Sequence, residues 1–148
     1  YTKRSRLYLA SLCAELQEYP LLLEFRNDEW QRASVLEEMR NRNLGFVVTD
    51  YPDLPGLPRP AATATSRIGY VRLHGRNTET WWSGDNASRY DYLYTTEELR
   101  EWIGKISDIA EITDNVMVVF NNHWRGKAVQ NAVELRKLLT SGPDLDVR

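Results

Sequence analysis

Cysteine is nearly absent from this sequence of 148 residues, which contains a single one, Cys13. A lone cysteine cannot form an internal disulfide, so the sequence favours a reducing compartment, which we take to be the cytoplasm. Free cysteine usually behaves as a small core hydrophobe, and we therefore expect Cys13 to be a buried helix residue.

Long apolar runs and an excess of positive charge are absent as well. No run approaches the roughly 20 apolar residues that a membrane-spanning helix requires. The 19 Lys and Arg residues are outnumbered by 21 Asp and Glu residues, which gives a formal net charge of -2. A basic surface is the usual footprint of nucleic-acid and anionic-membrane binding, so we expect neither partner.

Sequence signatures that name an activity are missing too. The chain has no Gly-rich phosphate-binding fingerprint, no CxxC pair and no GxSxG nucleophile motif. Function must therefore be inferred from the residues that the fold brings together.

Four short apolar runs predict buried strands, at residues 21–25, 46–49, 68–73 and 116–120. Apolar residues at spacings of three and four predict helices over residues 3–19, about 34–43, about 95–110 and 126–139. The pairs Ser34/Glu37 and Thr95/Glu98 have the spacing of capping boxes at two of these helix starts. Strands joined by such long connections pair in parallel, so the sequence predicts one α/β domain over residues 1–148.

Three segments do not fit this alternation of helices and strands. Residues 51–67 hold four of the six prolines and predict an irregular connection, since proline interrupts both helices and central strands. Residues 76–94 form a polar loop rich in aromatic side chains, and residues 140–148 form a polar tail.

Polar and charged residues lie at or just beyond the carboxyl end of each of the four predicted strands. They are Glu24 and Arg26, Asp50, Arg72 and His74, and Asn121 and Asn122. Ligands of parallel α/β folds bind outside the carboxyl ends of the strands, so we expect these side chains to line one shared site.

The residue types suggest a role for each of these side chains. His74, Glu24 and Asp50 are candidates for proton transfer. Arginine forks suit carboxylate and phosphate, and amides orient polar ligands, so Arg26, Arg72, Asn121 and Asn122 are candidate ligand-binding residues. Trp81 and Trp82, on the loop after the third strand, could stack on a sugar or a base.

Structural interpretations of the same residues remain open. The charged set could be a salt-bridge network that plugs one end of the sheet. Asn121 and Asn122 could form a turn or an N-cap before the last helix. The two tryptophans could pack over the mouth of the site, and we expect His123 to be a loop residue. Glu24, Asp50 and His74 are acceptable metal ligands, but Arg26 and Arg72 would repel a cation, so we expect neither metal nor cofactor.

Four separated motifs, "LLLEFRNDEW", "YVRLHGRN", "YDYLYTTEELREWIGKI" and "VMVVFNNHWRGKAVQNAVELRKLL", closely resemble the carboxyl-terminal half of the DUF72 (YecE-like) family. The resemblance implies a TIM-barrel-like fold and no established activity. By motif, the positions that match the family are Glu24, Phe25, Arg26, Trp30, Asp50, Arg72, His74, Gly75, Asn121 and Asn122.

Family members are longer than this chain, so the resemblance implies only the second half of a barrel, with about four parallel strands and flanking helices. We therefore expect either a homodimer that completes a barrel or a fragment of a longer protein. The open edges of such a half-barrel favour association.

The expected function is hydrolase or isomerase-type chemistry on an anionic or sugar-like small molecule at the strand ends. A non-catalytic ligand- or protein-binding module, which would use the aromatic loop between Trp81 and Tyr94, is the alternative, as is an inactive fragment.

Overall fold

Helices and strands alternate along the chain in a computed structural model that describes residues 1–141. The elements are α1 (Lys3–Glu15), β1 (Leu22–Leu23), η1 (Asp28–Trp30), α2 (Ala33–Asn41), β2 (Gly45–Asp50), β3 (Ile68–Leu73), α3 (Asn86–Arg89), α4 (Thr96–Ala110), β4 (Asn115–Phe120), η2 (Trp124–Gly126) and α5 (Lys127–Thr140). The predicted α/β class is confirmed.

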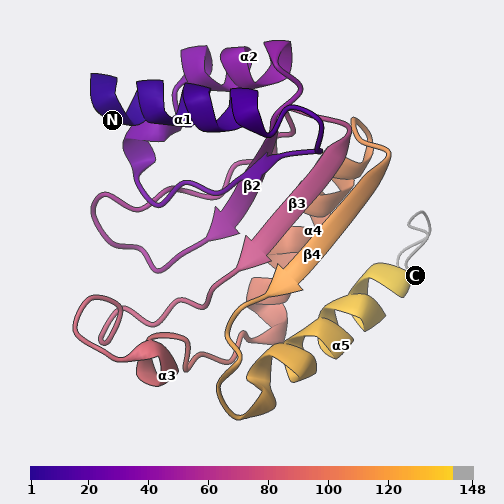
Figure 1. The fold of residues 1–148 in the computed structure, drawn as a ribbon. Coiled ribbons are helices and arrows are strands. Elements are labelled where there is room, and N and C mark those ends of the chain that lie inside the picture. The colour runs from indigo at the N-terminus through magenta and orange to yellow at the C-terminus, as the bar shows by residue number, and fades with distance from the viewer. Residues whose placement is uncertain (142–148) are drawn as a thin grey trace.

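The four strands form one parallel sheet in the order β1-β2-β3-β4 (Figure 1). Val48, Val71 and Val118 lie side by side across the three longer strands. Because every strand runs in the same direction, all four carboxyl ends lie at one edge of the sheet, which we call the rim.

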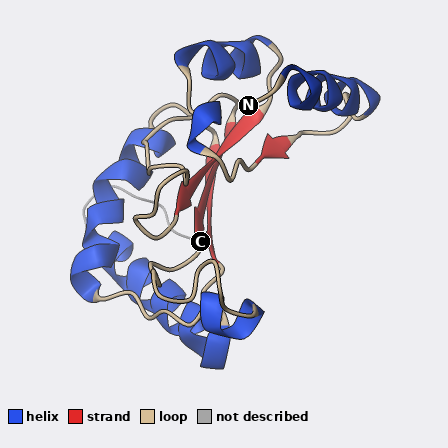
Figure 2. Cartoon of the chain, turned by 90° about the vertical axis from the view of Figure 1, so that its left-hand side faces the viewer, coloured by secondary structure: helices blue, strands red, loops and turns tan. Residues whose placement is uncertain are grey.

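Helices cover one face of this sheet, while its concave face has no helix over it within the described residues (Figure 2). Val71 and Leu73 pack into the core with Leu99 and Trp102 of α4. Side chains alternate along a strand, so the intervening residues point to the concave face. The partly or largely exposed ones are Tyr70, Arg72, Met117 and Val119.

Local sequence signals explain one predicted helix start and fail at another. The capping box of α4 forms as predicted, since Thr95 accepts from the Glu98 amide and Glu98 accepts from the Thr95 amide. The box predicted at Ser34 and Glu37 is wrong, because α2 begins at Ala33 and its N-cap, Arg32, makes no side-chain cap bond. Ser34 therefore lies within the first turn.

Other boundaries differ modestly from the predictions. The first helix ends at Glu15 instead of residue 19, because turns occupy residues 16–18 before Pro20. The predicted strand at 21–25 shortens to the two residues of β1. The loop at 76–94 contains the short helix α3, whose N-cap is Asp85.

Residues 51–67 contain neither helix nor strand. In the predicted tail at 140–148, Thr140 ends α5 and residues 142–148 lie outside the described part of the chain.

Candidate functional site

Glu24 lies at the centre of the polar residues on the rim. Its Oε1 atom accepts hydrogen bonds from the Tyr51 hydroxyl, at 2.8 Å, and from Nε of Arg26, at 3.2 Å. Its Oε2 atom pairs with Nη1 of Arg72 at 2.7 Å. The carboxylate thus joins side chains from the ends of β1, β2 and β3.

Asn121 extends this network to the end of β4. Its Oδ1 atom accepts from Nη2 of Arg72 at 3.1 Å, and its Nδ2 atom lies 3.2 Å from Nδ1 of His74. Since an amide nitrogen only donates, Nδ1 of His74 accepts and the neutral ring carries its proton on Nε2. Five predicted site residues therefore meet in one network: Glu24, Arg26, Arg72, His74 and Asn121.

His74 is enclosed by aromatic rings and has 0% of its surface exposed. Its ring stacks on Tyr51 with centroids 4.6 Å apart, and Trp81 and Tyr90 lie at 6.3 Å and 5.9 Å. Its Nε2 atom lies 3.3 Å from Oε1 of Glu24 but lacks the alignment of a hydrogen bond and has no other partner. The buried imidazole therefore lies directly beside the Glu24 carboxylate, on the side away from solvent.

The network sets the charge of both Glu24 and His74. Burial alone raises the pKa of Glu24, but contacts from His74, Tyr51 and Arg72 outweigh burial and hold this pKa well below its ordinary range. Burial lowers the pKa of His74, against the opposing pull of Glu24. At neutral pH a carboxylate therefore lies beside a neutral imidazole.

Arg26 and Arg72 give the rim a positive surface. Their side chains are 56% and 32% exposed, whereas the Glu24 side chain between them is 13% exposed. Two guanidinium groups against one carboxylate leave a local charge of about +1 when His74 is neutral. This arrangement suits an anion, because guanidinium donors bind carboxylate and phosphate in a fork.

Asp50 does not join the network at the shared rim, contrary to the prediction. It falls on the helix-covered face that Val48 occupies, because side chains alternate along β2. Nε of Arg76 donates to its carboxylate at 2.9 Å, and Arg76 continues to Glu98 and Glu101 of α4. Asp50 is 2% exposed, and burial raises its pKa against the influence of Arg76.

Asn122 is likewise turned away from the rim and is fully buried. Its Nδ2 atom donates to the carbonyl of Tyr92 and to Oδ1 of Asn131 in α5, both at 2.8 Å. Asn131 in turn bonds the backbone N–H and C=O of Tyr94. The structure therefore places Asn122 in a clamp between α5 and the loop before α4.

The two tryptophans of the loop have opposite environments. Trp81 is only 4% exposed and packs against Tyr51 and Tyr90, with ring centroids at 5.5 Å and 5.9 Å. Trp82 is 67% exposed. Trp81 therefore packs over the mouth of the site, and only Trp82 of the pair is exposed.

Sequence reasoning missed the aromatic members of the site. Tyr51 directly follows Asp50 and had the same strand-end signal as the chosen residues. Tyr90 lies in an irregular segment after α3, where no sequence pattern marks it. His123, predicted as a loop residue, is exposed, yet its ring lies 5.5 Å from Tyr90.

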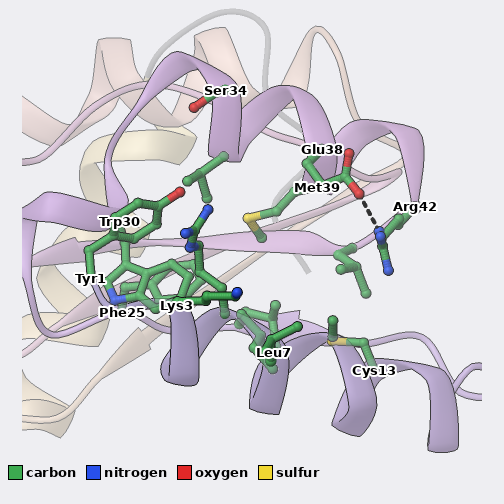
Figure 3. Close-up of a pocket in the computed structure, with 16 residues that line it drawn as sticks. Tyr1, Lys3, Leu7, Cys13, Phe25, Trp30, Ser34, Glu38, Met39 and Arg42 are labelled. Atoms are coloured by element: carbon green, nitrogen blue, oxygen red, sulfur yellow. Dashed lines mark hydrogen bonds and ion pairs between the residues drawn. The ribbon is translucent and has the colours of Figure 1, made fainter.

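A hollow of about 560 Å³ lies between α1 and α2 (Figure 3). Its lining is mainly apolar and includes Leu7, Phe25, Trp30 and Met39. Cys13 also lines it and is buried, as predicted, and burial raises the pKa of its thiol. None of the five residues of the Glu24 network lines this hollow, so it is separate from the rim.

Residues 1–141 contain neither a cluster of metal ligands nor a helix that could span a membrane. No three or more His, Cys, Asp or Glu side chains gather there in a group that could hold a metal ion. No helix in this range combines the length and the apolar character needed to cross a bilayer.

Known proteins resemble this chain in both sequence and fold. The family profile described as "Protein of unknown function DUF72" matches residues 1–146. The UPF0759 protein YunF of Bacillus subtilis (strain 168) is 28% identical, over 93% of this chain and 52% of the relative.

Two solved structures of DUF72 family proteins resemble the chain closely. One from Thermotoga maritima MSB8 has a TM-score of 0.86 and 36% identity, over 95% of this chain and 53% of the other. One from Enterococcus faecalis V583 has a TM-score of 0.85 and 25% identity, over 97% and 56%.

The chain spans about half the length of these relatives. Its parallel sheet with flanking helices superimposes on their TIM-barrel-like fold, as the sequence motifs predicted. The match covers nearly all of the sequence and includes the residues on the rim. The chain belongs to the DUF72 family, a family of proteins of unknown function.

Proposed function

We propose that the rim binds an anionic small molecule through Arg26 and Arg72 and acts on it by hydrolase or isomerase-type chemistry. One observation carries the proposal, namely that the ionised Glu24 holds both guanidinium groups at partly exposed positions outside the carboxyl ends of the strands. Parallel α/β folds bind their ligands in this place.

A sugar phosphate or a sugar acid fits this rim better than a neutral sugar. Its anionic group matches the local positive charge, and binding it costs little reorganisation because Glu24 already orients the two arginines. Glu24 itself is a weak proton acceptor at its lowered pKa. Its contribution to a reaction is therefore electrostatic, and it positions the groups that contact the ligand.

Binding of inorganic phosphate tests this function directly. Isothermal titration calorimetry at constant ionic strength measures the dissociation constant of phosphate for the unmodified protein, for Arg72→Gln and for Arg67→Gln. Arg67 precedes β3 at the opposite end of the same strand, is 79% exposed and pairs with Asp114 at the surface. We expect Arg72→Gln to weaken binding at least about tenfold, as loss of a charge-assisted contact implies, and Arg67→Gln to leave it unchanged.

Equal binding by the Arg72 and Arg67 variants would show that the rim is not the anion site. Failure of phosphate to bind the unmodified protein at millimolar concentration would have the same meaning.

A non-catalytic binding module is the second candidate function. The exposed Trp82 supports it, because an aromatic ring that is 67% exposed on a loop is typical of a contact surface. Under this function, Trp82→Ala abolishes capture of the partner or ligand while Arg72→Gln does not. The opposite pattern supports the anion site.

A second copy of the chain is the partner that we propose for the concave face. The chain covers 52% to 56% of its relatives, so a second copy supplies about as much chain as these relatives carry beyond the matched part. The face presents Met117, which is 43% exposed, and β4 lies at an edge of the sheet. Pairing would cover the face and that edge.

The cytoplasm is the compartment that we propose for this function. Cys13 is buried and not in a disulfide, which is the usual state of cysteine in a reducing environment.

A further inference from the structure

Neither predicted proton-transfer residue on the rim can exchange a proton with a ligand. Glu24 is ionised and its lowered pKa makes it a weak base at neutral pH. His74 has 0% exposure and is covered by Tyr51, Trp81 and Tyr90. A reaction at this rim therefore needs a different titratable group, one that solvent and ligand can reach.

His123 meets this requirement by its position and exposure. It follows β4 by three residues, two positions beyond Asn121, and is exposed. Its Nδ1 atom lies 2.9 Å from the backbone carbonyl oxygen of Asn121. A carbonyl oxygen only accepts, so in the neutral ring Nδ1 carries the proton and Nε2 carries the lone pair.

Tyr90 and Asn121 link the ring of His123 to the Glu24 network. Tyr90 packs on both histidines of the chain, with its centroid 5.5 Å from His123 and 5.9 Å from His74. The side chain of Asn121 bonds Arg72 while its backbone bonds His123. Two independent contacts therefore tie the exposed imidazole to the group that holds the guanidinium donors.

We propose that Nε2 of His123 is the atom that moves the proton for an anionic ligand held by Arg26 and Arg72. This inference rests on the proposed function. In a hydrolysis, Nε2 takes a proton from water while the water oxygen bonds to the ligand and the bond to the leaving group breaks. In an isomerisation, Nε2 takes a proton from a C–H bond beside a carbonyl of the ligand, and the electron pair moves onto the carbonyl oxygen as an enediolate. In both cases the ring becomes an imidazolium that keeps its Nδ1–H bond to Asn121. The same proton then passes to the leaving group in a hydrolysis or to the neighbouring carbon in an isomerisation, which restores the neutral ring.

Chemical labelling of the two histidines tests this assignment without knowledge of the substrate. Diethyl pyrocarbonate acylates accessible, neutral imidazole nitrogen, and peptide mapping by mass spectrometry locates the product. We expect His123 to react and His74 to resist, because His74 is fully buried. Inorganic phosphate at about ten times its dissociation constant should slow labelling of His123 about tenfold, since only the unbound fraction reacts.

Variants separate this inference from the proposed function. At the same phosphate concentration, protection of His123 should fall to about twofold or less in Arg72→Gln and persist in Arg67→Gln. If phosphate binds the unmodified protein by titration but leaves the labelling rate of His123 unchanged, His123 is not beside the anion and the assignment fails while the anion site stands. If phosphate does not bind at all, the result contradicts both the proposed anion site and the assignment of His123.

His123→Gln provides a control for folding. The residue is exposed, so we expect the urea midpoint of this variant to match that of the unmodified protein. A large loss of stability would mean that His123 is a structural residue and would overturn the assignment.

Discussion

Glu24 and Asp50 are both carboxylates at strand ends, and the structure gives them opposite environments. Glu24 faces the rim, where it contacts Arg26, Arg72 and Tyr51. Asp50 faces the helices, where Arg76 neutralises it. The difference comes from the alternation of side chains along a strand, since a shift of one position moves a residue from one face to the other.

Burial of neutral His74 makes stability depend on pH in a defined window. Burial lowers the pKa of His74 below its ordinary value of 6.5, so the unfolded chain binds more protons than the folded protein below that value. Stability from this group is present above about pH 6.5 and is lost as the pH falls. Between about pH 7.5 and pH 5.5 we expect the free energy of unfolding to drop by up to about 1.4 kcal/mol.

Urea unfolding at the two pH values measures this drop, with His74→Gln as the comparison. The drop should shrink in the variant, which still contains the exposed His123. The lowered pKa of Glu24 acts in a separate window, because its contribution is lost only below its ordinary value of 4.5. An identical drop in both proteins would contradict the role given to His74.

The two neighbouring tryptophans should differ sharply in their effect on stability. Trp81 is 4% exposed, and Trp81→Ala should lower the free energy of unfolding by about 3 kcal/mol through the cavity left among Tyr51 and Tyr90. Trp82 is 67% exposed, and Trp82→Ala should change it by less than about 0.5 kcal/mol. Urea denaturation checks both, and similar losses would contradict the burial of Trp81.

At the scale of elements, Gly75 and Tyr94 fix the turn that follows β3. Gly75 follows His74 with a φ of 97°, and a Cβ atom there would lie 2.7 Å from Cβ of Tyr92, so the turn requires glycine. The amide of Gly75 donates to the Tyr94 hydroxyl at 2.8 Å. These contacts connect the end of β3 with the segment that begins α4.

The formed and the unformed capping boxes provide a matched pair of substitutions. Thr95→Ala should lower the free energy of unfolding by about 1 kcal/mol, because the Glu98 amide loses its acceptor. Ser34→Ala should cost nothing measurable, since Ser34 is exposed and caps no helix. Equal losses, measured by thermal or urea unfolding, would contradict the helix start assigned to α2.

At the scale of the whole molecule, helices cover one face of the sheet, and no helix among residues 1–141 covers the other (Figure 2). Tyr70, Met117 and Val119 contribute apolar surface to the open face, and β1 and β4 form its two edges. Parallel sheets are normally covered on both faces. This imbalance is the physical basis for the proposed pairing with a second copy.

Light scattering coupled to size exclusion measures this pairing. We expect the chain to elute as a dimer at micromolar concentration and Met117→Lys to shift it toward monomer, because a charge would be buried in the interface. The matched control is Ile112→Lys, which places the same charge at another exposed apolar position, between α4 and β4. A monomer in every case would rule out the second copy as the partner of this face.

Most of the secondary structure could be predicted from sequence periodicity. The runs at 68–73 and 116–120 correspond to β3 and β4 within one residue, because continuous apolar runs are typical of parallel strands. The predicted burial is wrong for β4, in which no residue is buried because its concave face is uncovered within the described residues. Predicted strand boundaries were wrong where tertiary packing decides them, as at β1, which was predicted over residues 21–25 and is two residues long. The helix start at Ser34 failed because capping geometry depends on how the chain enters the helix.

The sequence by itself determined the parallel α/β order, the family and the gathering of polar residues at one edge, because these follow from local periodicity and motif spacing. The tertiary structure decided which of those residues meet. It joined Glu24, Arg26, Arg72, His74 and Asn121, and it directed Asp50, Asn122 and Trp81 into packing. Only the three-dimensional pleat and the path of the loops set which face each side chain occupies, and no one-dimensional pattern records that choice.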